Sequence, residues 1–547
     1  MPLPRRLSVL AVLVCICVVL TSSAVASAYN AHPKLVVIIV IDQFRGDYLE
    51  RYREQFSEGG FRVFLDRGAY FIDCNYDYAN TRTAPGHATL STGTYTSGHG
   101  IAANEWWDPQ KKKLVTSVFD DATKLVGAEQ PGVGASPHNL MSDTLGDELK
   151  LATGGKARVY AVSLKDRAAV LPAGFAGDGA YWIEPKTGAW ITSTYYRTEL
   201  PEWTRNFNSS PRVDKFWNRE WKDGNGNVLG TTAPRNGKDG KAAGFYEVVG
   251  STPFANEYEF AFAKELVLYE KLGAGPDTDL LTISLSANDI LGHQVGPDSP
   301  QMHSMALELD RQLAEFITFL GHQVGLANVW MALSADHGVA PLPEFAKTLR
   351  LPSANLDNGT LQEQVNALLT KKYDKKADYL AAMDYPIAWL NQEAFAGHKE
   401  GEAEADVGEA LLQVGLTGYF TKSQLAHASG IPNNEIGRRY AHSYSPEGGW
   451  YVMGIPKPFQ VASKGTDHAT PFSYDTHVPL AFYGLAFQPG IYRTHAEPTD
   501  LAVTLASLLG INAPTQATGR VLTEALAPAH RVPPGGDHPS APVGGVR

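Results

Sequence analysis

Six side chains of types that bind metal ions stand at or near the ends of apolar segments in this 547-residue chain. If these segments are parallel strands, their carboxyl ends meet at one edge of a sheet, where ligands bind in such folds. A mixture of carboxylate and imidazole ligands suits zinc better than calcium or magnesium. The sequence therefore predicts a site for two zinc ions, with the ligands Asp42, Asp289, His293, Asp336, His337 and His477.

Each of these residues taken singly has a more ordinary explanation. An aspartate at the end of a strand commonly caps a helix or stabilises a turn. The segments SANDILGH, around Asp289, and SADHG, around Asp336, are more specific because each places two potential ligands close together. The prediction rests on the combination of all six.

A threonine-rich segment, TRTAPGHATLSTG, offers a candidate nucleophile. Its hydroxyl residues precede a Pro-Gly pair and a run compatible with a helix, whose N-terminus would attract an anion. A nearby metal ion can lower the pKa of such a hydroxyl and create a nucleophile. Composition alone leaves both Thr81 and Thr83 as candidates, and either could be only a helix cap.

The elements that must position these residues are predicted by apolar runs that alternate with helical patterns. The runs are KLVVIIVID, ARVYAVSL, DLLTISLSAND, VWMALSAD and THVPLAFYG. Such near-continuous apolar runs are typical of strands buried on both faces of a parallel sheet. Residues 301–325 carry apolar side chains at spacings of three and four, as in an amphipathic helix. We therefore predict an α/β fold, with a mostly parallel central sheet and helices on both faces.

Two intervals interrupt this alternation, at about 170–260 and 345–465. We predict that they are insertions that cap the active edge of one catalytic domain, residues 33–527.

Residues 1–28 contain two arginines, an apolar stretch and Ala-Ser-Ala, which predicts a cleaved secretory signal peptide. The alternative is an uncleaved membrane anchor, for which the apolar run is short. Residues 528–547 are rich in proline and glycine, and we predict that they are disordered.

Charge and cysteine content limit the classes of function. The formal net charge of −11 disfavours nucleic acid as a dedicated partner. Removal of the signal peptide would leave Cys74 as the single cysteine, which excludes an intramolecular disulfide. We expect a periplasmic or secreted protein without a stable membrane anchor, whose partners are small anionic molecules. A monomer is expected, with an oligomer as the alternative.

Together these motifs resemble those of the alkaline phosphatase superfamily, most closely the PafA-type phosphate-irrepressible alkaline phosphatases. The resemblance covers about residues 35–509 and is carried, in the family's order, by VIDQFRGDYL, TAPGHATLSTG with HGIAAN, SLKDRAAVLPAG, SANDILGH, SADHG and YDTHVPL. The family's nucleophile is the hydroxyl residue directly before the Ala-Pro pair. The resemblance therefore implies Thr83 as the nucleophile rather than Thr81.

The resemblance also implies a role for each remaining site residue. One zinc ion would bind the leaving-group oxygen and would be held by Asp289, His293 and His477. The other would also bind and activate Thr83 and would be held by Asp42, Asp336 and His337. The phosphoryl oxygens would be bound by Asn104, Lys165 and Arg167.

The activity that follows is the hydrolysis of a broad range of phosphate monoesters through a phospho-threonine intermediate. Lys165 and Arg167 favour monoesters because a monoester presents an extra negative oxygen that a diester lacks. Two alternatives remain, a nucleotide pyrophosphatase/phosphodiesterase of the same superfamily and an inactive module that binds phosphorylated ligands. Four residues near the site segments are expected to orient ligands and not to bind metal, namely His87, His99, His468 and Asp475.

Overall fold

The computed structural model describes residues 32–210, 214–232, 244 and 249–528. The predicted signal peptide at 1–28 lies outside the described residues. So does all but the first residue of the predicted disordered tail at 528–547, and both assignments stay predictions.

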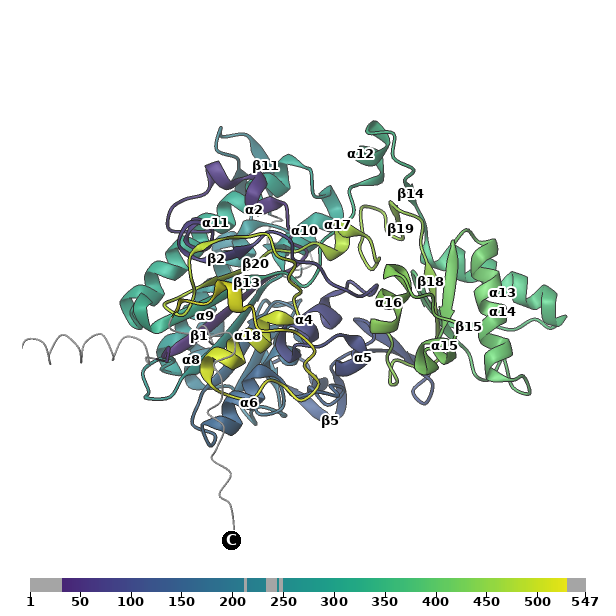
Figure 1. The fold of residues 1–547 in the computed structure, drawn as a ribbon, viewed down its shortest axis with the longest axis horizontal. Helices are drawn as coiled ribbons and strands as arrows, with labels where there is room; N and C mark the ends of the chain where they lie inside the picture. The colour runs from purple at the N-terminus through teal and green to yellow at the C-terminus, as the bar shows by residue number, and fades with distance from the viewer. Residues whose placement is uncertain (1–31, 211–213, 233–243, 245–248, 529–547) are drawn as a thin grey trace, which may run out of the picture.

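Five parallel strands form the centre of the molecule (Figure 1). In spatial order they are β8 (Gly179–Ile183), β7 (Val159–Ser163), β12 (Asp279–Leu285), β1 (Leu35–Ile41) and β13 (Val329–Ser334). Every residue of these strands is buried, as expected for apolar runs that are covered on both faces. The prediction of an α/β fold with a mostly parallel sheet is confirmed.

Further strands extend this sheet to eleven within the described residues. Beyond β13 lies β20 (Leu480–Tyr483), which runs antiparallel to it, and beyond β8 lies β9 (Trp190–Ser193). Both β8 and β9 fall in the interval 170–260, so part of this predicted insertion belongs to the central sheet. The two strands were missed because their sequences, GAYWI and WITS, are only five and four residues long and form no extended apolar run.

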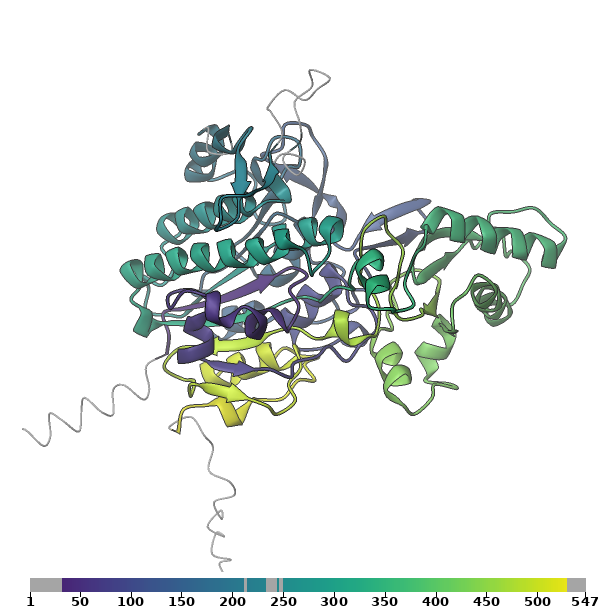
Figure 2. The same ribbon diagram turned by 90° about the horizontal axis from the view of Figure 1, so that it is seen from above.

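Two sets of helices cover the sheet (Figures 1 and 2). Helices α9 (Pro253–Tyr269) and α11 (Pro300–Gln323) pack against each other, and α9 contacts β7 and β12. On α11 the predicted apolar stripe, which includes Met305, Leu309 and Leu313, is buried. The other set contains α7 (Asp166–Ala173), α4 (Thr83–Thr92) and α18 (Asp500–Leu509), and α7 contacts β7, β8 and β12.

The register of the parallel strands brings their carboxyl ends to one edge. Ile41 of β1 pairs with Leu285 of β12, and Val40 pairs with Ser334 of β13. The residues that directly follow these strands therefore meet above the sheet, and this edge carries the site described below.

The interval 345–465 contains a second sheet that forms a lobe beside the main body (Figure 1, right). Its four strands are antiparallel: β15 (Leu380–Asp384), β16 (Ile387–Leu390), β18 (Tyr451–Ile455) and β17 (Gly418–Thr421). Helices α13 (Asn358–Tyr373) and α14 (Glu400–Gln413) pack on it and share a separate apolar core with it. The lobe reaches the main body where the Arg82 guanidinium pairs with Asp384 at 2.5 Å.

None of the described helices combines the length and the apolar character that a membrane crossing requires.

Candidate metal centre

Three aspartates and three histidines gather at the active edge of the sheet in two adjacent groups. Asp42, Asp336 and His337 form what we call the inner group, and Asp289, His293 and His468 form the outer group. Within each group the potential ligand atoms lie within 4.8 Å of one another. The His337 and His468 rings stack with their centroids 3.7 Å apart, so the two groups are neighbours.

The inner group is completely buried and lacks partners for its polar atoms. Its three side chains have no exposed surface. Among the described residues, no hydrogen-bond partner reaches Asp42 Oδ1, Asp336 Oδ2 or His337 Nε2. His337 Nδ1 donates to the Gly338 carbonyl at 2.8 Å, which leaves the lone pair of Nε2 free. Unpaired buried polar atoms are costly, and a single divalent cation would pair all three.

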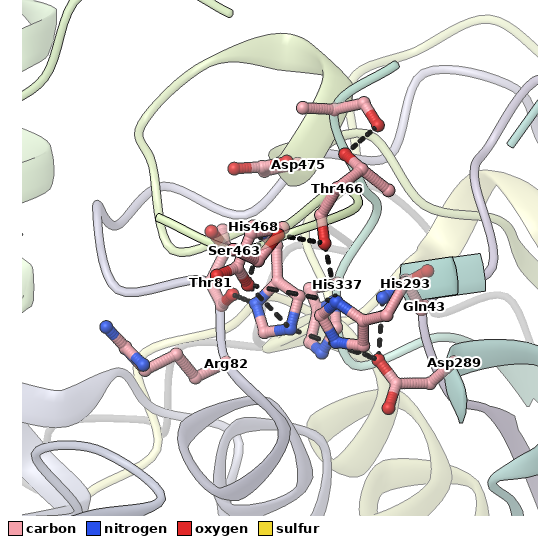
Figure 3. A network of polar contacts seen from close by, with 12 residues as sticks. Gln43, Thr81, Arg82, Asp289, His293, His337, Ser463, Thr466, His468 and Asp475 are labelled. Atoms are coloured by element: carbon pink, nitrogen blue, oxygen red, sulfur yellow. Dashed lines mark hydrogen bonds and ion pairs between the residues drawn. The ribbon is translucent and has the colours of Figure 1, made fainter. Parts of the chain in front are cut away.

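The two imidazoles of the outer group are oriented alike. His293 Nδ1 donates to the Thr466 carbonyl at 2.8 Å, and His468 Nδ1 donates to the Thr81 carbonyl at 2.7 Å. The Nε2 atoms are therefore the ones available to a metal ion, and they lie 3.1 Å and 3.9 Å from Asp289 Oδ1. Although burial favours the neutral ring, the Asp289 carboxylate raises the pKa of His293 to about 10, so a metal ion would have to displace the Nε2 proton of that ring. Figure 3 shows the two rings together with His337 beside Asp289. This arrangement could hold a second divalent cation.

His468 therefore stands where the sequence led us to expect His477, and that ligand assignment is wrong. His477 precedes β20, which lies three strands away from β12 in the order β20–β13–β1–β12, or about 14 Å at the usual spacing between strands. Its Nε2 donates to the Ile72 carbonyl at 2.9 Å, and it lines a separate polar cavity of about 420 Å³. His468 was expected to orient metal ligands without being one. Its position beside Asp289 and His293 instead makes it a candidate ligand.

Burial and mutual repulsion act together on the carboxylates of the two groups. Burial and the neighbouring Asp289 and Asp336 carboxylates hold the pKa of Asp42 well above its usual range. Lys165 Nζ lies 2.5 Å from both Asp42 Oδ2 and Asp289 Oδ2. Although burial opposes the charged form of Asp289, Lys165 and His293 lower its pKa well below the usual value. One lysine is thus the nearest cation for two of three buried carboxylates, which favours additional bound cations.

The two stacked imidazoles are in the protonation state that metal binding needs. Burial lowers the pKa of His337, and burial together with the neighbouring His337 and His293 lowers that of His468 well below its usual value. Both rings are therefore neutral near pH 7, and a neutral imidazole is the form that donates a lone pair to a metal ion.

Thr83 begins helix α4, and its side chain is almost completely buried. The helix packs tightly against the inner group, since a methyl group added at Gly86 would lie 2.6 Å from Asp336 Cβ. His87, one turn further along, contacts the Thr83 carbonyl at 2.8 Å and Asp336 Oδ2 at 3.3 Å. The first turn of α4 is therefore fixed beside the inner group.

The rival threonine, Thr81, is engaged in backbone hydrogen bonds. Its hydroxyl donates to the Thr470 carbonyl and accepts from the Thr470 N–H, both at 3.0 Å. An attack by Thr81 would have to break this pairing with the loop that carries His468. The arrangement favours Thr83.

The three residues expected to bind phosphoryl oxygens differ in their surroundings. Asn104 Oδ1 accepts the Ala84 N–H at 2.8 Å, at the N-terminus of α4, which leaves its NH₂ group to donate. Lys165 stands between the inner and outer groups, as described above. Arg167 lies in the first turn of α7 with a side chain that is 23% exposed, and its Nη1 is 3.8 Å from Asp166.

Gln43 is a site residue that the sequence did not indicate. Its backbone N–H donates to Asp336 Oδ1 at 3.1 Å, and its side-chain amide donates to Asp289 Oδ1 at 2.7 Å. It thereby connects the inner group to the outer group. Its φ of 62° is a left-handed conformation that is uncommon outside glycine, a signal that only the structure provides.

Several known proteins are similar to this chain over most of its length. Residues 36–446 match the family model described as type I phosphodiesterase/nucleotide pyrophosphatase. The chain is 35% identical to alkaline phosphatase PafA of Elizabethkingia meningoseptica over 90% of this chain and 94% of the relative. It is 32% identical to alkaline phosphatase PhoV of Synechococcus elongatus over 91% of this chain and 93% of that protein.

A solved structure agrees with these sequence matches. The crystal structure of wild-type alkaline phosphatase PafA superimposes with a TM-score of 0.82 at 32% identity, over 91% of this chain and 99% of that chain.

We predict that His468→Ala weakens zinc binding at one of two sites, whereas His477→Ala does not. Loss of a residue that only orients a metal ligand costs about 10- to 100-fold in affinity, so loss of a ligand should cost at least this much. Zinc titration of the metal-depleted proteins, with metal content measured after dialysis, distinguishes the variants. Loss of a zinc equivalent in His477→Ala but not in His468→Ala would contradict the placement of the outer group.

Proposed function

As a PafA-like member of the alkaline phosphatase superfamily, the chain is a phosphate monoester hydrolase, and we propose that it acts through a covalent phosphate on Thr83. It also belongs to the type I phosphodiesterase/nucleotide pyrophosphatase family. The observation that carries the proposal is the position of Thr83. It opens a buried helix against the inner group, while the hydroxyl of Thr81 is held by the backbone.

We further propose two zinc ions per chain, one in the inner group and one in the outer group, with His468 in the place first given to His477. The donor set of carboxylates and imidazoles supports zinc. When bound, such ions supply positive charge that lowers the pKa of a hydroxyl and stabilises negative charge on oxygen. They would also neutralise Asp42 and Asp289, which frees the Lys165 ammonium group for substrate.

The chain's own groups then account for phosphoryl transfer. The Thr83 oxygen attacks phosphorus, so that a bond from Oγ to phosphorus forms while the bond to the leaving alcohol oxygen breaks. Water then hydrolyses the phospho-threonine and releases inorganic phosphate. Through both steps Asn104, Lys165 and Arg167 would donate hydrogen bonds to the phosphoryl oxygens, and the Asn104 amide is already oriented by its bond to Ala84.

Small phosphate monoesters are the substrates on which PafA-like enzymes act, and we propose that this chain accepts a broad range of them. We also propose that residues 1–28 direct export to the periplasm or the exterior and that the mature protein acts as a monomer.

Two alternatives are less well supported. A diesterase preference, the first alternative, is disfavoured by the Lys165–Arg167 pair. A binding module without activity, the second, is disfavoured by PafA and PhoV, at 35% and 32% identity, which are named as alkaline phosphatases.

We predict that Thr83→Ala lowers the hydrolysis of p-nitrophenyl phosphate by about a thousandfold or more, because the nucleophile is lost. Thr83→Ser should retain part of the activity, whereas Thr81→Ser should stay close to wild type. After an acid quench during turnover, peptide mass spectrometry should find phosphate on Thr83. Phosphate on Thr81, or full activity of Thr83→Ala, would refute the covalent mechanism.

We predict that Lys165→Ala and Arg167→Ala each reduce kcat/KM for p-nitrophenyl phosphate about 10- to 100-fold, since each removes one charge-assisted contact. The activity toward bis-p-nitrophenyl phosphate should fall much less, because a diester carries one negative charge fewer. Metal content, measured in parallel, controls for an effect on the carboxylates that Lys165 contacts. Equal losses for both esters at unchanged metal content would contradict the assigned role.

A further inference from the structure

The charged groups of the site are distributed unevenly around the outer group. Lys165 Nζ lies between the two groups, 2.5 Å from Asp42 and from Asp289. Asp467 contacts the outer group from the loop that carries His468, which it directly precedes. Its carboxylate lies 4.0 Å from His293 Nδ1 and 3.9 Å from His468 Nε2.

Asp467 is the carboxylate of this cluster that faces solvent. Its side chain is 29% exposed, compared with 0% for Asp42 and 6% for Asp289. The neighbouring His293 side chain is 33% exposed. The outer group is therefore partly open to solvent at His293 and Asp467, and a leaving group bound there would lie near the Asp467 carboxylate.

The backbone around Asp467 is held in place on both sides. The Ala340 N–H donates to the Asp467 carbonyl at 3.2 Å, and the Thr466 N–H donates to the His293 carbonyl at 3.0 Å. The Asp467 carboxylate accepts the His468 N–H at 2.9 Å. These contacts fix the position of the negative charge, so that it can act on a substrate without being reoriented first.

The other charges near Asp467 are each paired with a further group. His293, the nearest, lies 4.0 Å from Asp467 and pairs with Asp289 at 3.1 Å. Arg82 and Asp384 also act electrostatically on Asp467, and they form an ion pair with each other at 2.5 Å. The Asp467 carboxylate is therefore the negative charge left over beside the outer group. A charge at this distance in a partly exposed site alters the interaction with a charged ligand by about 1 kcal/mol or more, a several-fold effect on binding.

We propose that Asp467 selects among phosphate monoesters by the charge of the leaving alcohol. It favours alcohols that carry an ammonium group and disfavours those that carry a carboxylate or a further phosphate. This inference rests on the proposed function, in which the outer group faces the leaving group. Asp467 makes no contact with the transferred phosphate in this account, so it determines specificity and does not take part in the chemistry.

The test uses three phenyl phosphates that carry aminomethyl, methyl or carboxylate groups in the para position. Relative to the neutral ester, Asp467→Asn should raise kcat/KM for the carboxylate ester and lower it for the aminomethyl ester. The ratio between the two charged esters should shift by about tenfold at low ionic strength and by less in 1 M salt. Because each ester is compared between two proteins, its intrinsic reactivity cancels.

Asp378→Asn is a matched control, because it removes the same charge from an exposed position on the lobe. Asp378 lies six residues before Asp384 along the β15 segment, about 20 Å away in an extended chain. Its ester ratio should equal that of the wild type. Asp467→Ser is a second variant at the site and should reproduce the shift of Asp467→Asn.

The failure of this inference can be distinguished from the failure of the proposed function. If wild type hydrolyses all three esters and neither Asp467 variant shifts the ratio, only the role of Asp467 is overturned. If both variants lose all three activities together, the role is also overturned, because Asp467 then serves to hold His468. If wild type hydrolyses none of the esters, the proposed function fails and this inference fails with it.

Discussion

Repulsion among three buried carboxylates is the constraint on which the rest of the site depends. Asp42, Asp289 and Asp336 lie at one edge of the sheet with almost no exposed surface, and Lys165 is the cation that contacts two of them. Burial of unpaired charge is costly, and the raised pKa of Asp42 is one result, while bound cations would offset the same repulsion. The neutral rings of His337 and His468 and the unpartnered atoms of the inner group favour the same binding. The proposed metal binding and the proposed catalysis thus depend on one arrangement of charges.

The parallel register of the sheet is what produces this arrangement. Because β1, β12 and β13 end at the same level, the aspartates that follow them reach the same region although they lie far apart in the sequence. The helix that begins at Thr83 is fixed against Asp336 at Gly86, where no side chain would fit. Thr83, the proposed nucleophile, is thereby held by backbone packing as much as by side-chain contacts.

The sequence was sufficient to predict the fold class and five of the six residues in the two groups. It failed where the lateral order of strands matters. His477 precedes an apolar run much as the other ligands adjoin theirs, but β20 pairs antiparallel on the far side of β13 and places it away from Asp289. His468 lies on a loop whose path is set by hydrogen bonds to His293, Ala340 and Thr81, and no periodic pattern records such contacts. Gln43 was missed for a similar reason, since its left-handed backbone is not visible in its residue type.

Anomalous diffraction at the zinc edge, from crystals of the mature protein grown with zinc, tests the central claim most directly. The account predicts two peaks about 2.0–2.2 Å from the ligand atoms, one bounded by Asp42, Asp336 and His337 and the other by Asp289, His293 and His468, with the Thr83 oxygen beside the first. A single peak, a peak bound by His477, or a Thr83 side chain directed away from both ions would contradict it.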